Sequence, residues 1–69
     1  MSDHVYKTIE ITGSSTDGVT QAIDRAVAKA SQTVRNLDWF ELISVRGQID
    51  DARVAHYQAT VKIGFRLED

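Results

Sequence analysis

The spacing of hydrophobic positions changes along this 69-residue chain and separates a first strand from a helix. Apolar and polar residues alternate over residues 3–12, which predicts a strand with two unlike faces. From Val19 onward the apolar positions recur at steps of three and four, which predicts one amphipathic helix from about residue 16 to 35. We expect Ser15 to be the N-cap, because its hydroxyl can accept an orphan backbone N–H, and Asn36 to end the helix.

The second half of the chain predicts two more strands joined by a turn. Residues 38–49 are rich in β-branched and aromatic types. Within them Trp39 shares its parity with Glu41, Ile43 and Val45, whereas Arg46 shares the other parity with Phe40, Leu42 and Ser44. A polar turn at 50–53 follows, and residues 55–67 then alternate with a strict period of two, so one face of this strand should pack on the helix.

This order of elements, β-α-β-β, predicts the α+β class and one domain over residues 1–69. The helix returns the chain, so the first two strands run the same way and the turn reverses the third. We expect the third strand to lie between the other two, because all neighbours are then antiparallel. One helix covers only one sheet face, and the other face carries polar residues of the third strand: Gln58, Thr60, Lys62 and Arg66. Two edge strands stay unprotected, which favours coverage by neighbouring copies of the chain.

Composition narrows the ways in which so short a chain can be stabilised. A domain of this size has a marginal core and usually needs disulfides, a metal or partner subunits. The chain has no Cys, and His4 and His56 are too far apart in sequence to form a ligand cluster. Oligomerisation is therefore the remaining way to stabilise this domain.

Charge and hydropathy exclude two classes of partner. The net charge is −2, with eight basic and ten acidic residues interspersed, so no basic stripe for nucleic acid is present. No apolar run approaches the roughly 18–20 residues that cross a bilayer. The opening Met1–His4 lacks the charged and apolar regions of a signal peptide, so the expected compartment is the cytoplasm.

The sequence offers no recognisable catalytic arrangement, and we expect a protein that is not an enzyme. Ser, His and Asp occur, but no nucleophile elbow does. Residue 2 is Ser, so the N-terminal proline amine of small β-α-β tautomerases is missing. The turn Gly13–Gly18 lacks the lysine of a phosphate loop; its N–H groups could meet an anion, but a simple helix entry is favoured.

Three polar or aromatic residues on the last two strands are candidates for ligand binding. Trp39, the only tryptophan, offers a wide face that can stack on a flat ring, and Gln58 offers a donor and an acceptor for that ring's edge. Arg46 could bind a phosphate. Taken singly, each favours a structural interpretation: a half-buried strand aromatic, an exposed Gln, and a solvated charge or subunit salt bridge.

Taken together, these residues lie in strings that resemble the bacterial dodecins over essentially the whole chain. The strings are Leu37–Glu41, Arg46–Gly47, Tyr57–Gln58 and Lys62–Glu68, with Val5–Lys7 and Gly13–Gly18 near the start. Trp39 and Gln58 stand 19 positions apart, as in that family. One departure is Thr16, where relatives often have Pro at the first helical position.

The resemblance implies a hollow homododecamer of 23 symmetry with flavin sites at subunit contacts. Two stacked isoalloxazine rings would lie between symmetry-related copies of Trp39, with Gln58 bonding the pyrimidine edge and Arg46 binding phosphate. The resemblance also implies a role as a flavin buffer, that is, a protein that stores flavin and quenches its photochemistry. Bacterial members bind flavin mononucleotide (FMN) and can take up coenzyme A, whereas archaeal members favour riboflavin. The alternative is a structural or interaction homo-oligomer without a dedicated ligand.

Overall fold

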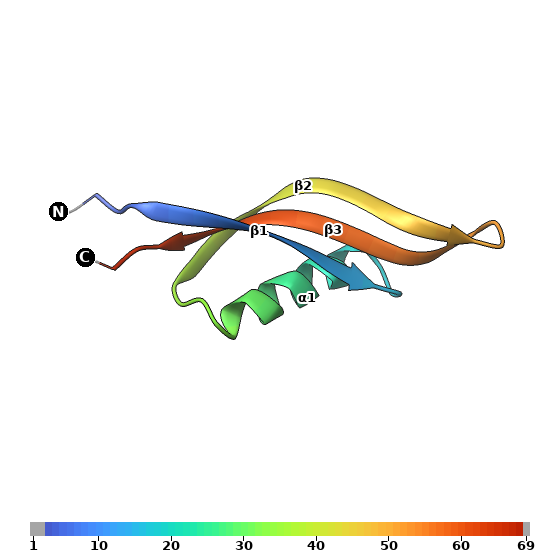
Figure 1. Ribbon diagram of the computed structural model, residues 1–69, viewed down its shortest axis with the longest axis horizontal. Helices are drawn as coiled ribbons and strands as arrows, with labels where there is room; N and C mark the ends of the chain where they lie inside the picture. Colours follow the sequence, from blue (N-terminus) through green and yellow to red (C-terminus); the bar gives the residue numbers. More distant parts are fainter. Residues whose placement is uncertain (1–2, 69) are drawn as a thin grey trace.

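A computed structural model of the protein describes residues 3–68 and contains one helix and three strands (Figure 1). In chain order these are β1 (Tyr6–Ser15), α1 (Val19–Ser31), β2 (Leu37–Asp50) and β3 (Arg53–Arg66). The sheet order is β1-β3-β2, and both pairings are antiparallel. The predicted class, element order and central position of the third strand are therefore confirmed.

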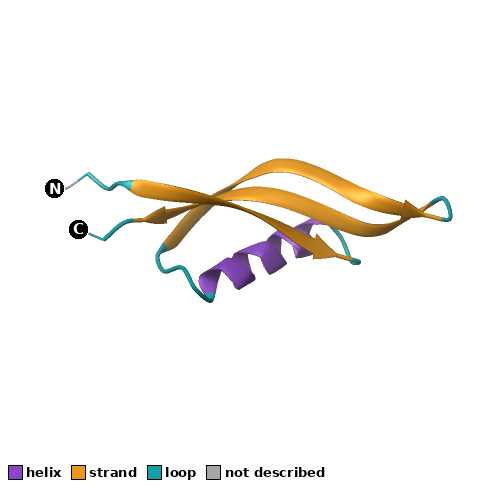
Figure 2. Ribbon diagram, viewed as in Figure 1, coloured by secondary structure: helices purple, strands orange, loops and turns teal. Residues whose placement is uncertain are grey.

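The molecule is elongated, because the hairpin of β2 and β3 projects well past the helix (Figure 2). The extents along its principal axes are 55 × 20 × 14 Å. The start of β1 and the end of β3 lie at one end of the molecule, and the turn of the hairpin lies at the other. No helix within residues 3–68 has both the length and the apolar character needed to span a membrane.

The helix begins later than predicted, and Ser15 is not its N-cap. Ser15 is the last residue of β1, where it pairs with Tyr57, and its Oγ accepts the N–H of Asp17 at 2.9 Å. The hydroxyl therefore closes the turn that leaves the strand. The helix starts at Val19 with Gly18 as N-cap and no side-chain cap. The prediction was wrong because the ladder with β3 holds the chain extended to Ser15, three residues beyond the end that the alternation indicated.

The helix also ends earlier than predicted, at Ser31 instead of near residue 35. The Ser31 hydroxyl donates to the backbone carbonyl of Ala28 at 2.7 Å. The backbone N–H groups of the residues that follow donate to carbonyls of the last helical turn. Such local side-chain bonds compete with helix continuation. Asn36 adopts a left-handed φ of 66°, which Asn tolerates, and turns the chain into β2. Its backbone C=O accepts the N–H of Arg66 at 3.1 Å, so it ties the start of β2 to the end of β3.

The core between helix and sheet is small. Three helix alanines meet three β3 residues there: Ala22, Ala26, Ala30, Ala59, Val61 and Ile63. The close approach requires Gly13 on β1, since a Cβ at that position would lie 2.0 Å from the carbonyl oxygen of Ala22. The alternation predicted for the third strand is therefore confirmed, because its odd-numbered residues are the ones that the helix covers.

The helix packs mainly against β1 and β3. On β2 only the first residue, Leu37, packs against the core, and the apolar residues further along the strand stay exposed. We call the exposed apolar residues on the helix side of the projecting hairpin the hairpin strip; they are Phe40, Leu42, Val45, Ile49 and Val54. Their exposed fractions run from 44% to 74%. A contiguous apolar surface of this kind commonly marks an interaction site.

Candidate functional site

The sheet face opposite the helix, which we call the open face, displays the even-numbered side chains of β3. Gln58, Thr60, Lys62 and Gly64 lie on it, because the odd-numbered residues between them pack under the helix. Cross-strand partners share a face, so the register assigns side chains of β1 and β2 to the open face as well. The sequence-predicted candidates Trp39, Arg46 and Gln58 can therefore be located relative to one another.

An irregularity in β2 brings Trp39 and Arg46 to the same face. Trp39 pairs with Gly64 and Arg46 pairs with Gln58, although seven positions separate Trp39 from Arg46 along β2. Strict alternation would place them on opposite faces. The register shifts between Leu42 and Ser44, so one extra residue is inserted and the side-chain parity reverses there. All three candidates consequently face away from the helix.

Trp39 lies on the surface with its indole against the backbone of the central strand. A Cβ built at Gly64 would come within 2.2 Å of the indole Cε2 and 2.3 Å of Cζ2. Gly64 is buried although it belongs to the open face, because the ring covers it. The side chain remains 41% exposed. The indole is thus seated on one side and available to a partner on its remaining surface.

A second aromatic side chain approaches Trp39 from the opposite edge of the sheet. Tyr6 on β1 and Trp39 on β2 have ring centroids 6.4 Å apart, with the planes inclined at 58°. This separation and tilt are typical of a favourable aromatic pair. Hydrogen bonding to the Asp38 carboxylate, with lesser contributions from desolvation and the carboxylate charge, raises the pKa of Tyr6, while Arg66 opposes the shift.

Gln58 and Arg46 form a polar pair towards the hairpin end of the open face. The Nε–H of Arg46 donates to Oε1 of Gln58 at 3.0 Å. This bond orients the amide so that its NH₂ group points elsewhere, and it occupies one of the five guanidinium donors. Between this pair and Trp39 the open face carries a hydroxyl pair, in which the Oγ1 atoms of Thr12 and Thr60 lie 2.8 Å apart.

Trp39 and Gln58 of one chain do not form a single site. Their places along β3 are Gly64 and Gln58, six residues apart, which corresponds to roughly 20 Å at about 3.3 Å per residue. A three-ring heterocycle is shorter than this. A planar ligand stacked on Trp39 would therefore reach Gln58 or Arg46 only if these belonged to a different copy of the chain.

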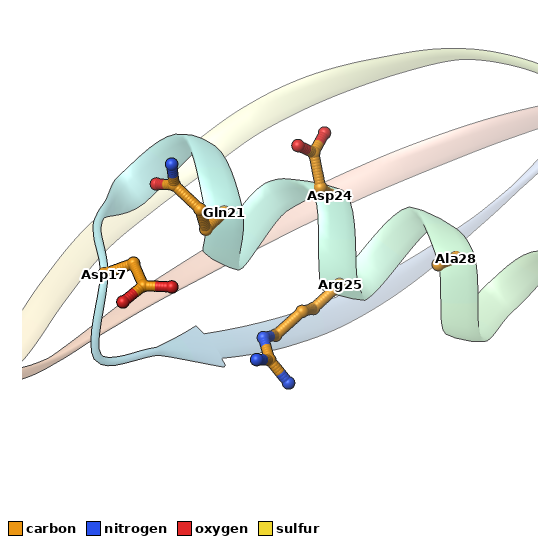
Figure 3. Close-up of a pocket in the computed structure, with 5 residues that line it drawn as sticks. All are labelled: Asp17, Gln21, Asp24, Arg25 and Ala28. Carbon is orange, nitrogen blue, oxygen red and sulfur yellow. The ribbon is translucent and has the colours of Figure 1, made fainter.

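The rest of the described surface offers no converging set of catalytic or metal-binding groups. Residues 3–68 contain no cluster of three or more His, Cys, Asp or Glu that could hold a metal ion. A depression of about 350 Å³ at the start of α1 is lined by Asp17, Gln21, Asp24, Arg25 and Ala28. Figure 3 shows these side chains diverging, with Asp24 and Arg25 pointing to opposite sides of the helix.

Sequence reasoning missed two members of this site, Gly64 and Tyr6. Gly64 occupies a position of the polar parity in a regular strand, and an isolated Gly inside a strand often marks a close approach by another group. Tyr6 carried no such signal, because only the register reveals that its strand faces Trp39 across β3.

Comparison with known proteins gives a consistent family. Residues 5–68 match the family model described as Dodecin. The chain is 48% identical over 65 residues to the dodecin of Thermus thermophilus, an alignment that covers 94% of each protein. It is 58% identical to the solved dodecin of Streptomyces coelicolor, covering 100% of this chain and 99% of that one, with a TM-score of 0.93. The Streptomyces davaonensis dodecin structure is 51% identical, covers 99% and 100%, and has a TM-score of 0.93.

Proposed function

The chain belongs to the dodecin family, and we propose that it stores flavin, most specifically FMN, as stacked pairs held between copies of Trp39. Dodecins are small binding and storage proteins and not enzymes. In this proposal Trp39 stacks on the isoalloxazine ring, Gln58 reads the pyrimidine edge and Arg46 binds the phosphate. The bound pair is withdrawn from the free pool, and its photochemistry is quenched.

The observation that carries this proposal is the display of the only tryptophan on a sheet face that the helix leaves uncovered. The indole takes no part in the core, which consists of Ala, Val and Ile side chains, and it stays 41% exposed. Stacking of a flavin on the exposed indole gains about 0.5–1.5 kcal/mol per aromatic contact beyond area burial. Burial of the ring adds roughly 25 cal/mol per Å².

The polar pair supplies the orientation that stacking lacks. The amide NH₂ of Gln58 can donate to a carbonyl of the flavin, and its Oε1 keeps a second lone pair beyond the bond from Arg46. The terminal nitrogens of Arg46 remain available for phosphate, which guanidinium binds in a bidentate manner. A ring without the matching edge would leave buried polar atoms unpaired, so the site would discriminate against it.

A stacked pair requires subunit assembly, and we propose the homododecamer of 23 symmetry. The separation of roughly 20 Å between Trp39 and Gln58 prevents one chain from completing the site. The hairpin strip supports assembly independently, because its apolar side chains would be covered by neighbouring copies. Twelve chains of 7.7 kDa correspond to about 92 kDa, which native mass spectrometry can measure.

Fluorescence titration with FMN tests the function. The assembled protein should quench FMN emission at a fixed stoichiometry, and Trp39→Ala should lose the quenching and weaken binding while keeping the assembly. Riboflavin, the proposed alternative to FMN, is titrated in the same way. Coenzyme A, proposed as an additional ligand, has no flavin emission, so its binding is measured by calorimetry. Unchanged FMN emission with an intact assembly would favour the second candidate, a structural oligomer without a dedicated ligand. The proposed compartment is the cytoplasm, which cell fractionation tests.

Complementation tests whether the site is shared between copies. We expect Trp39→Ala and Gln58→Ala assemblies to bind FMN weakly when separate. If chains of both kinds are unfolded and refolded together, some contacts will pair an intact Trp39 with an intact Gln58 from another chain. Partial recovery of quenching supports a composite site, and no recovery in mixed assemblies of normal mass contradicts it.

A further inference from the structure

Tyr6 and Trp39 meet although they belong to opposite edges of the sheet. Neighbouring strands lie about 4.8 Å apart, so the backbones of β1 and β2 are separated by roughly 10 Å with β3 between them. The ring centroids are only 6.4 Å apart. Both rings therefore lean inward over the central strand.

The central strand permits this approach because Gly64 has no side chain. Any Cβ at position 64 would lie inside the indole ring, at 2.2 Å from Cε2. The indole of Trp39 consequently rests on the backbone of Gly64, which blocks movement towards the sheet. Movement of the ring sideways over the sheet, and its tilt, must be restricted by another group. The group that stands beside it is Tyr6.

Tyr6 is anchored through its backbone, which pairs with Arg66 at the end of the central strand. Its ring contacts the indole at a centroid distance of 6.4 Å. Asp38, the residue immediately before Trp39, raises the pKa of Tyr6, so this carboxylate also acts on the tyrosine from the segment of β2 that carries the indole. A ring that starts from a paired strand and leans against its neighbour can act as a wall for it.

We propose that Tyr6 is a positioning residue that restricts the tilt and rotation of Trp39, so that the indole offers a pre-set face for stacking. A ring held in its bound orientation loses less conformational freedom when a ligand arrives, which raises affinity without a new ligand contact. The consequence for binding rests on the proposed flavin function. The restriction of the ring is a property of the protein alone and can be measured without ligand.

Time-resolved fluorescence anisotropy of the ligand-free protein reports this restriction directly, because Trp39 is the only tryptophan. We expect Tyr6→Leu to lose residual anisotropy on the nanosecond scale, where side-chain motions occur. Tyr6→Phe keeps the ring and should retain most of it. Tyr57→Phe, which removes the hydroxyl of the other tyrosine on the helix side of β3, should match the parent. In FMN titrations we expect the dissociation constant of Tyr6→Leu to rise about three- to tenfold, and that of Tyr6→Phe less than about twofold.

The proposal would be overturned if the residual anisotropy of Trp39 were the same in Tyr6→Leu as in the parent, regardless of the result of the FMN titration. If the parent itself fails to bind FMN, the storage function falls while the anisotropy still decides the role of Tyr6. Native mass spectra of every variant check that the assembly is retained. Should Tyr6→Leu not assemble, Tyr6→Val, a β-branched residue suited to a strand, provides the same removal of the aromatic wall.

Discussion

A methyl group added at Gly64 would occupy the place of the Trp39 ring. In Gly64→Ala the new Cβ would lie 2.2 Å from Cε2, 2.3 Å from Cζ2 and 2.7 Å from Cδ2 of the indole. Carbon atoms rest at about 3.5–4.0 Å, so the ring must move by roughly 1.3–1.8 Å. Because Trp39 is a surface side chain, we expect the ring to swing outward and the sheet to remain paired.

The displaced ring should bind FMN more weakly by a measurable amount. One face of the indole represents roughly 100 Å² of apolar surface, worth about 2.5 kcal/mol at 25 cal/mol per Å². Loss of about half of that burial, and of about half of the stacking term of 0.5–1.5 kcal/mol, gives about 1.5–2 kcal/mol. This corresponds to a dissociation constant raised roughly ten- to thirtyfold. Fluorescence titration with FMN measures the change.

Two controls separate this effect from unfolding. Ala is more favourable than Gly within a strand by about 0.5–1 kcal/mol, so the thermal stability of Gly64→Ala should not fall markedly. In a Trp39→Phe background the smaller ring reaches less far over Gly64, and the same Ala substitution should cost much less affinity. The reasoning is refuted if Gly64→Ala binds FMN as tightly as the parent, or if its cost is equal in both backgrounds.

Four further predictions concern other parts of the chain. Ala52→Gly should stabilise the hairpin turn by about 0.5–1 kcal/mol in denaturant unfolding, because Ala52 has a left-handed φ of 64°; lower stability would contradict this. Asp38→Asn should lower the raised pKa of Tyr6 towards its ordinary value of 10.0 in a phenolate absorbance titration. In the parent, the interaction of Tyr6 with Asp38 stabilises the folded state fully below pH 10, and this stabilisation is lost as the pH rises through the raised pKa of Tyr6. An unchanged Tyr6 titration in Asp38→Asn would exclude Asp38 as the cause of the shift. Arg46→Ala should reduce the preference for FMN over riboflavin about tenfold, and an unchanged ratio would remove the phosphate role. Leu42→Asp introduces a charge into the hairpin strip, so native mass spectrometry should detect species smaller than the parent assembly; a parental mass would show that the strip is not an interface.

The sequence predicted the order of elements and the faces of the most regular strand. The alternation from Ala55 to Leu67 is strict, so its buried parity could be identified without a structure, and Ala59, Val61 and Ile63 are indeed the buried residues. The central place of this strand followed from the preference for antiparallel neighbours. The helix was recognisable from its apolar period, but its ends were not.

The face of each site residue on β2 could not be predicted. The bulge lies between Leu42 and Ser44, where Ile43 is an ordinary strand former, and neither Gly nor Pro marks it. A register shift arises from the fit of two strands to each other, and a single strand's pattern does not contain it. Strict parity therefore separated Trp39 from Arg46, whereas the structure places both on the open face.

Side-chain type alone also gave wrong or missing predictions at positions whose conformation is set by contacts between distant parts of the chain. Ser15 has the side chain of an N-cap and precedes an amphipathic run, yet its backbone stays in the ladder with β3 and its hydroxyl serves a turn. Gly64 shows the opposite case, in which a residue without evident chemistry becomes necessary because another strand's side chain comes to rest on it. In both cases the deciding contact joins residues far apart in the chain.

The position of the helix connects assembly with binding. Because α1 lies against β1 and β3, the helix side of β2 keeps an apolar surface that one chain does not cover, and the buried core remains small. The open face, free of any helix, holds the indole at one end and the polar pair of Arg46 and Gln58 at the other. These two groups are too far apart to act on one ligand within a chain. If the proposed flavin function holds, association of copies would both cover the hairpin strip and bring Trp39 of one chain to Gln58 and Arg46 of another, so assembly would stabilise the small core and complete the proposed site.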